Sequence, residues 1–133
     1  MAANPNPSKT ALRVGWTLSI LPALFVLSSG VNFMRHADFI KEGMAPFGYP
    51  ESLMFTLGAL EFGCSLIYMI PQTAVLGAIL TTGFLGGAVA THVRVGDPTW
   101  PAAVIVATLM WLGLYLREPR LRALVPLLSE RQR

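Results

Sequence analysis

Long apolar segments separated by short polar ones dominate the chain. A helix needs about 20 mostly apolar residues to cross the roughly 30 Å hydrocarbon layer of a bilayer. Four segments have nearly this length, and they cover residues 14–33, 52–70, 74–93 and 100–116. The pattern therefore predicts four transmembrane helices, that is, an all-α fold built as an integral membrane four-helix bundle.

Proline residues support these boundaries, because proline is tolerated in the first turn of a helix and disfavoured deeper inside one. Those near the ends of the segments are Pro46, Pro50, Pro71, Pro98, Pro101 and Pro119. We divide the chain into a flexible polar tail over 1–13, a four-helix domain over 14–118 and a basic tail over 119–133. We expect the first apolar segment to be retained as a helix and not cleaved as a signal peptide.

The composition agrees with a membrane protein. The chain of 133 residues is 53% hydrophobic and 13% charged, whereas soluble domains carry about 25% charged residues. The 17 charged residues (10 Lys and Arg plus 7 Asp and Glu) are too few to cover a water-facing globule. Disorder is excluded as well, because disordered chains are rich in charge. The single cysteine, Cys64, excludes an internal disulfide and a dithiol pair.

The basic residues indicate how the helices are oriented. An even number of spans places both ends of the chain on one side, and that side carries Lys9, Arg13, Arg117, Arg120, Arg122, Arg131 and Arg133. The opposite side carries Arg35, Lys41 and Arg94. Because lysine and arginine accumulate on the cytoplasmic side of membrane proteins, we expect both termini to be cytoplasmic.

The basic C-terminal tail contains a short amphipathic segment, 119–128, in which Arg120 is followed by Leu121, Leu124 and Leu128. We expect it to lie at the membrane surface with its arginines toward lipid headgroups. The basic residues are not interleaved with aromatic ones in a patch, so we expect no nucleic-acid partner.

Small residues are concentrated in the third apolar segment, 74–93. They are Gly77, Gly83, Gly86, Gly87, Ala88 and Ala90. Because small residues let helix backbones approach closely in a membrane, we expect this helix to be central and to pack against at least two neighbours. An alternative is that the glycines leave room for a ligand.

Glu61 is the main functional candidate. It is the tenth residue of the segment 52–70, so its carboxyl group lies near the middle of the membrane, where a charge is costly. Cys64, Ser65 and Tyr68 follow on the same helical face and extend a polar stripe. Glu61 either exchanges protons or binds a ligand, or it is a neutral acid hydrogen-bonded to Thr81, Thr82 or Thr108.

We expect a second set of polar side chains at the outer end of the bundle, opposite the end that holds both termini. An antiparallel arrangement brings together Asn32, which follows Ser28 and Ser29, with His92 and Arg94. Such a mouth would narrow onto Glu61, roughly 10–15 Å deeper at 1.5 Å rise per residue. The alternatives are an interfacial role for His92 and a loop ion pair between Arg94 and Asp97.

Metal and cofactor chemistry have little support in the sequence. The two histidines, His36 and His92, would suffice for haem ligation, but their spacing does not require it. A zinc site needs three or four converging ligands, and none are evident. Neither a phosphate-binding loop nor a nucleophile motif is present. We therefore predict no metal site, and the sequence gives little support to a haem.

Residues 48–53 (GYPESL), Glu61 and residues 83–98 (GFLGGAVATHVRVGDP) together resemble the DoxX-like family. The similarity continues through residues 114–122 and covers roughly residues 14–126. The resemblance implies a small four-helix integral protein of a bacterial inner membrane. The family takes its name from a subunit associated with thiosulfate:quinone oxidoreductase and terminal quinol oxidase in archaea. A shared fold alone does not assign an activity.

Three hypotheses for function follow. The first is an accessory or redox-associated membrane subunit that binds a lipophilic molecule such as a quinone, with Glu61 and His92 as hydrogen-bonding or proton-exchanging groups. Asn32, Arg94, Asp97 and Tyr68 are further candidates for this site. The second is a structural or interaction protein in which Glu61 fixes the packing. The third is a proton-coupled small exporter that uses Glu61. A membrane redox partner would fit the first hypothesis, whereas an exporter would need a second copy of the chain to form a pathway.

Overall fold

The computed structural model describes residues 7–124, and every regular element in this range is helical. Helices α1 and α2 cover Lys9–Met34 and Asp38–Met44. The 3-10 turns η1 (Ala45–Phe47) and η2 (Glu51–Leu53) lead into α3 (Met54–Met69), and η3 (Pro71–Thr73) leads into α4 (Ala74–Arg94). Helices α5 (Pro101–Arg117) and α6 (Pro119–Leu124) complete the described part. The predicted all-α fold is confirmed.

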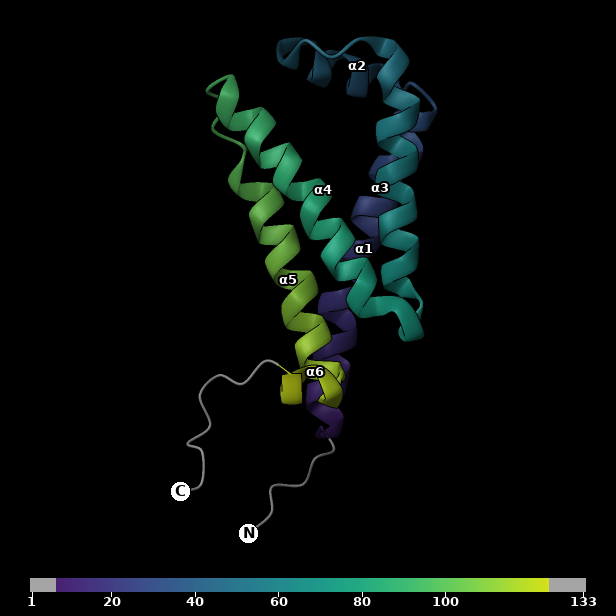
Figure 1. Ribbon diagram of the computed structural model, residues 1–133, viewed down its shortest axis with the longest axis vertical. Helices are drawn as coiled ribbons and strands as arrows, with labels where there is room; N and C mark the ends of the chain where they lie inside the picture. The colour runs from purple at the N-terminus through teal and green to yellow at the C-terminus, as the bar shows by residue number, and fades with distance from the viewer. Residues whose placement is uncertain (1–6, 125–133) are drawn as a thin grey trace.

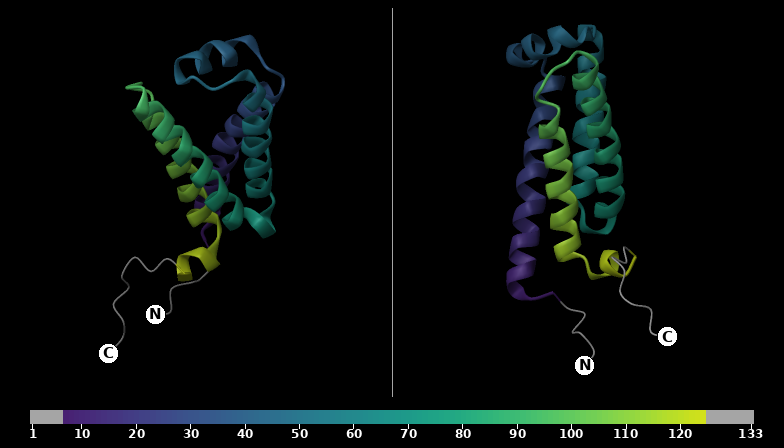
Figure 2. Two further views of the ribbon diagram at one scale, coloured as in Figure 1. Left: turned by 45° about the horizontal axis from the view of Figure 1, so that its top comes forward. Right: turned by 90° about the vertical axis from the view of Figure 1, so that its left-hand side faces the viewer.

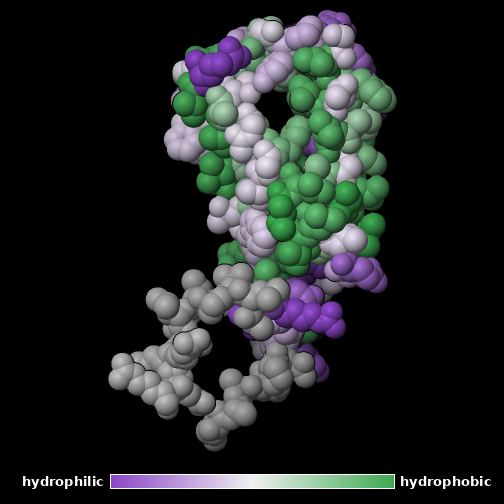
Figure 3. All heavy atoms as spheres, viewed as in Figure 1, coloured by the Kyte–Doolittle hydropathy of each residue, from purple (hydrophilic) through white to green (hydrophobic). Residues whose placement is uncertain are grey.

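Three helical segments are long and apolar enough to cross a membrane: Lys9–Met34, Glu51–Met69 and Pro71–Arg94. Helix α5 is also apolar but has only 17 residues. Large apolar side chains cover the outside of the molecule, for example Leu21 and Phe25 on α1, which are 63% and 64% exposed. The green apolar surface in Figure 3 shows the same property, which is typical of a helix bundle surrounded by lipid.

The boundary of the first helix differs from the prediction. Helix α1 begins at Lys9, so residues 9–13, which we assigned to a flexible tail, are helical. The Ser8 hydroxyl accepts a hydrogen bond from the Ala11 backbone N–H at 3.1 Å, which caps the free amide groups of the first turn. No helix was predicted where α2 lies, between the first two spans.

Helix α6 forms the first part of the predicted amphipathic segment 119–128. The rest of that segment, and the basic residues Arg131 and Arg133, lie outside the described residues. The predicted position of this tail at the membrane surface therefore stays a prediction.

The helices form two pairs that diverge toward one end. Helices α1 and α3 form one pair and α4 and α5 the other, and the pairs separate toward α2 (Figure 1). The left view of Figure 2 shows the same V-shaped opening. At the other end α1 begins, α5 ends and α6 follows, so the first and the last described residues both lie there.

Helix α1 contributes most to the packing, because it makes the most extensive contacts with both α3 and α5. Its backbone crosses α3 closely where Gly30 faces Gly58, and a Cβ atom on Gly30 would lie 2.8 Å from the Gly58 carbonyl oxygen. It crosses α5 where Gly15 faces Gly113. These glycines permit the close approach of α1 to α3 and α5, and within α4 only Gly77 plays a similar part, against α3.

The prediction that residues 74–93 form the central helix was therefore wrong. Within α4, Gly77 packs tightly on the Tyr68 backbone, but a Cβ atom added to Gly83, Gly86 or Gly87 would meet nothing within 4 Å. Helix α4 does contact two neighbours, α3 and α5. The space left open at these three glycines is what the alternative, that the glycines leave room for a ligand, requires.

Candidate functional site

A cavity of about 390 Å³ lies between the two helix pairs at the end that α2 covers. Helices α1, α3 and α4 and the segment 44–49 line it, and its wall is mainly apolar. The polar side chains in this wall are Ser29, Tyr49, Glu61, Thr91 and His92. Figure 3 shows a hollow at the same end of the molecule. Because a few polar groups converge in an apolar cavity, this is the best candidate for a small-molecule site.

A larger hollow, about 650 Å³, lies between α4 and α5. Its wall is almost wholly apolar. Two of the hydroxyl groups there are already engaged, because Thr108 donates to the Val104 carbonyl and Thr82 donates to the Ala78 carbonyl. This surface suits lipid chains and offers little for specific recognition.

Glu61 projects from α3 into the cavity wall and is 6% exposed. Its Oε2 accepts a hydrogen bond from the Ser29 hydroxyl of α1 at 3.2 Å. The close crossing at Gly30 and Gly58 explains this contact, because it brings the neighbouring Ser29 against α3. Placing Glu61 inside the bundle fits the cost of exposing a carboxyl group to lipid.

None of the three threonines that we considered as partners of Glu61 forms a hydrogen bond with it. Thr82 and Thr108 bond to carbonyl groups of their own helices, and Trp111 donates to the Thr82 hydroxyl at 2.7 Å. The Thr81 hydroxyl is buried without a hydrogen-bond partner among the described residues. The partner of Glu61 comes from α1 instead, and it was not predicted from the sequence.

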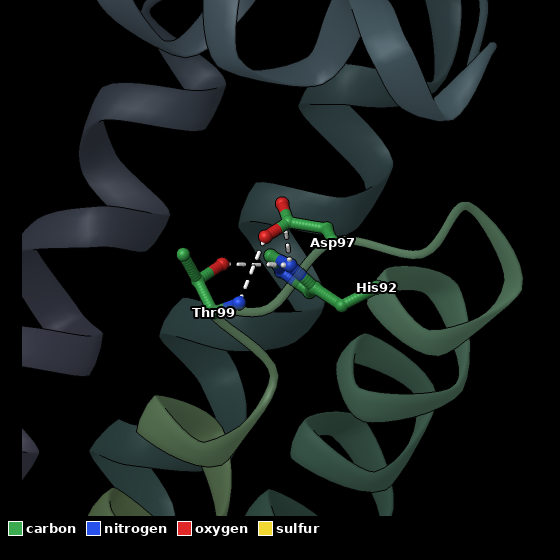
Figure 4. Close-up of polar contacts among 3 residues, drawn as sticks. All are labelled: His92, Asp97 and Thr99. Atoms are coloured by element: carbon green, nitrogen blue, oxygen red, sulfur yellow. Dashed lines mark hydrogen bonds and ion pairs between the residues drawn. The ribbon is translucent and has the colours of Figure 1, made fainter.

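His92 forms a local polar cluster at the end of α4. Its Nδ1 lies 3.1 Å from Oδ2 of Asp97 and 3.1 Å from the Thr99 hydroxyl (Figure 4). The Thr99 backbone N–H donates to Oδ1 of Asp97 at 2.8 Å. Gly96, at a φ of 72°, permits this turn, in which the Asp97 N–H also bonds to the His92 carbonyl.

The charge state of Asp97 decides which ring nitrogen of His92 carries the proton. Hydrogen bonds from the backbone N–H and the hydroxyl of Thr99 hold the pKa of Asp97 below its ordinary value, so it is a carboxylate at neutral pH. Because a carboxylate only accepts hydrogen bonds, Nδ1 of His92 must carry the proton. In neutral His92 the other nitrogen, Nε2, is then left to accept a hydrogen bond from a ligand.

The segment that follows α2 closes over the end of α4. The Tyr49 hydroxyl lies 3.0 Å from the Thr91 hydroxyl, and Arg94 donates to the Phe47 carbonyl at 2.5 Å. The Phe47 ring also packs edge-on against the His92 ring, with the ring centroids 4.6 Å apart. These contacts connect the two helix pairs across the wide end of the V.

The expected ion pair between Arg94 and Asp97 does not form. Asp97 pairs with His92, and Arg94 reaches the Phe47 carbonyl instead. The tight turn at Gly96 is the physical reason, because it folds Asp97 back onto the helix from which Arg94 points away.

The structure brings together only part of the predicted site. Glu61 and His92 line one cavity, whereas Asn32, Arg94, Asp97 and Tyr68 are absent from its wall. Asn32 donates to the Ser28 carbonyl of its own helix. Tyr68 is buried and donates to the Met110 carbonyl at 2.7 Å, so it connects α3 to α5. Ser65 likewise connects α3 to the Ala23 carbonyl of α1.

Sequence reasoning missed Tyr49, Thr91 and Thr99. The Tyr49–Thr91 contact spans 42 residues, and no spacing rule predicts it. Thr99 had a local signal, because an aspartate two residues before a threonine commonly bonds to its backbone N–H. Among residues 7–124 no group of three or more metal-ligating side chains comes together.

Comparison with known proteins identifies the family. No curated protein and no solved structure matches the chain. The family model for the DoxX-like family matches residues 17–113, which cover most of α1, all of α2, α3 and α4, and most of α5. The match includes Glu61, His92 and all the other residues that line the cavity. The chain belongs to the DoxX-like family.

Proposed function

We propose that the protein binds a lipophilic small molecule with a polar head, such as a quinone, in the cavity between the helix pairs. It would do so as an accessory subunit of a redox system in the membrane. The observation that carries this proposal is that Glu61 of α3 and His92 of α4 line the same apolar cavity.

The cavity offers suitable chemistry for a quinone-like head group. Its apolar walls favour a flat ring, and its volume of about 390 Å³ falls within the range of small-molecule sites. Nε2 of His92 accepts a hydrogen bond from a ring hydroxyl group of the reduced form. Glu61 bonds to or exchanges a proton with the opposite side of the ring.

We further propose that the protein lies in a bacterial inner membrane with all four long helices spanning it. Helix α5, at 17 residues, reaches the minimum length for a span. The excess of basic residues where α1 begins and α5 ends supports a cytoplasmic position for that end. The cavity then opens toward the opposite side, and a redox partner or a second copy would bind within the membrane.

The test is direct measurement of binding by purified protein in neutral detergent. Short-chain ubiquinone and menaquinone analogues serve as probes, and tryptophan fluorescence reports binding. We expect Glu61→Gln and His92→Leu each to weaken binding about tenfold, the effect of losing one good hydrogen bond. Glu51→Gln is the matched control, because Glu51 has an exposed side chain outside the cavity. Absence of binding by the natural protein would overturn the proposal, as would unchanged binding by both cavity variants.

One observation favours a structural role for Glu61 instead. Its hydrogen bond with Ser29 joins α1 to α3, as polar side chains commonly do between membrane helices. That hypothesis predicts that Glu61→Gln changes the thermal stability and leaves ligand binding and complex formation intact. Measuring both quantities on the same variant separates the two functions.

A further inference from the structure

Arg117 occupies an unusual environment at the C-terminal end of α5. Its guanidinium lies 4.3 Å from the centroid of the Trp16 ring and 5.5 Å from that of the Tyr68 ring. Its Nε is buried and has no hydrogen-bond partner within residues 7–124. The ion pairs formed in this range are Lys41–Glu51 and His92–Asp97, so no described carboxylate neutralises Arg117.

The packing of the helices fixes this position. Gly15 lets α1 approach α5 so closely that a Cβ atom there would lie 3.1 Å from the Arg117 backbone nitrogen. Trp16 is therefore held beside the end of α5. The Tyr68 ring is held as well, because its hydroxyl bonds to the Met110 carbonyl. Arg117 is thus positioned by aromatic rings from two other helices and not by a carboxylate of residues 7–124.

The surroundings of Arg117 are positively charged. Four more basic residues belong to the described elements at this end, namely Lys9, Arg13, Arg120 and Arg122. The only acidic residue in those same stretches, Glu118, accepts a hydrogen bond from the Arg120 backbone N–H. In Figure 2, the start of α1 and the end of α5 lie at this same end. The local field therefore attracts an anion.

The end of α5 would ordinarily disfavour an anion, because its last carbonyl groups carry partial negative charge. Arg122 offsets that effect. Its side chain donates to the Tyr115 carbonyl at 2.8 Å and to the Leu116 carbonyl at 2.6 Å. Arg122 is therefore occupied with the helix end, and Arg117 is left with donors to offer.

We propose that Arg117 binds the phosphate group of an anionic membrane lipid. Aromatic rings contact the guanidinium, and its N–H groups still match the geometry of phosphate oxygens. The apolar spans α1 and α3 and the shorter apolar helix α5 begin or end at this end of the bundle, where lipid headgroups would lie. Trp16 suits the same boundary, because tryptophan favours the headgroup region.

The experiment compares two phospholipids with the same acyl chains: both carry a phosphate, but in phosphatidylcholine the choline ammonium neutralises it, whereas phosphatidylglycerol keeps a net negative charge. The full chain is purified in neutral detergent, and binding of phosphatidylglycerol and phosphatidylcholine is measured by native mass spectrometry and thermal unfolding. We expect phosphatidylglycerol to bind about tenfold more tightly and to raise the unfolding temperature. Arg117→Gln should abolish this preference, and Arg117→Lys should reduce it because lysine lacks the planar fork.

Arg13→Gln is the matched control, since Arg13 is an exposed cation at the same end of the molecule. It should retain the preference to within about twofold. Equal losses in Arg13→Gln and Arg117→Gln would indicate a diffuse charge effect and overturn the proposal. Competition by millimolar inorganic phosphate would also overturn it, because the site would then take free anions.

A second variant keeps the test decisive if Arg117→Gln does not fold. Trp16→Leu retains the charge of Arg117 and removes the nearer aromatic ring. We expect it to keep its helical circular dichroism and to lose most of the preference for phosphatidylglycerol. A preference equal to that of the natural protein would contradict the proposed site.

Discussion

The Ser29 hydroxyl of α1 donates a hydrogen bond to the Glu61 carboxyl group of α3 at 3.2 Å. Both residues line the cavity between the helix pairs. The bond therefore joins the best-packed pair of helices and also holds the one acidic side chain that faces the cavity among the described residues. Stability and ligand binding can be separated at this position by changing one partner at a time.

Ser29→Ala should destabilise the protein by about 1–3 kcal/mol, because it leaves the buried Glu61 without its hydrogen-bond partner. Thermal unfolding in detergent measures the effect. Ser28→Ala is the control, since the Ser28 hydroxyl bonds only to the Phe25 carbonyl of its own helix. If both variants unfold at the same temperature, the interhelical bond does not contribute to stability.

Gly58→Ala should be among the most destabilising small substitutions in α3. The added Cβ would lie 2.6 Å from the Gly30 carbonyl oxygen and 2.8 Å from the Met34 backbone nitrogen. Because backbone atoms cannot move aside cheaply, we expect a loss of about 1–3 kcal/mol, measured by thermal or denaturant unfolding.

Gly63→Ala provides the comparison within the same helix. Nothing lies within 4 Å of its added Cβ, and alanine is the better helix former, so stability should stay equal or rise slightly. Equal stability of the Gly58 and Gly63 variants would contradict the close crossing of α1 and α3.

The sequence was sufficient to predict the membrane class and most of the helix boundaries, because these depend on runs of apolar residues. For α4 the predicted range 74–93 ends one residue before the observed Arg94. The sequence was not sufficient to predict which helix is central. A small-residue pattern shows where close approach is permitted, but the contacts of Gly15 and Gly30 depend on the partner helix.

The same limit applies to the candidate site. Glu61 was identifiable because a carboxyl group in the middle of an apolar run is costly. Its partner was not, since Ser29 is one of several hydroxyl groups at similar depth and lies 32 residues away in the chain. The pairing of His92 with Asp97 is local, yet it depends on the backbone conformation of Gly96.

Gly87→Leu tests whether the cavity holds the ligand. Gly87 lines the cavity, and nothing lies within 4 Å of an added Cβ, so a leucine side chain can extend into the empty space. We expect binding of the quinone analogues to weaken about tenfold or more, with the unfolding temperature unchanged or raised. Gly63→Leu, which places the same side chain outside the cavity wall, should bind normally. Normal binding by Gly87→Leu would place the ligand elsewhere.

The pH dependence of the turn at the end of α4 follows from Asp97. Hydrogen bonds from Thr99 lower the pKa of Asp97 in the folded protein. A lowered pKa contributes stability above the ordinary value of about 4, and that contribution is lost as the pH falls through the lowered pKa. The turn should therefore remain intact from neutral pH down to about 4 and loosen only below it.

The backbone amide signal of Thr99, followed from pH 7 to below pH 4, measures this expectation, because that amide donates to Asp97. Nitrogen-15 NMR of His92 tests how Asp97 sets the tautomer of the ring. Between pH 7 and 8 the neutral ring should carry its proton on Nδ1 in the natural protein, because the Asp97 carboxylate accepts from that nitrogen. Asp97→Ala should shift the proton toward Nε2 and weaken the binding of quinone analogues, because Nε2 then no longer accepts. Asp38→Ala, which removes an exposed carboxylate on α2, should leave both signals unchanged. The same tautomer in the natural protein and in Asp97→Ala would show that Asp97 does not orient His92.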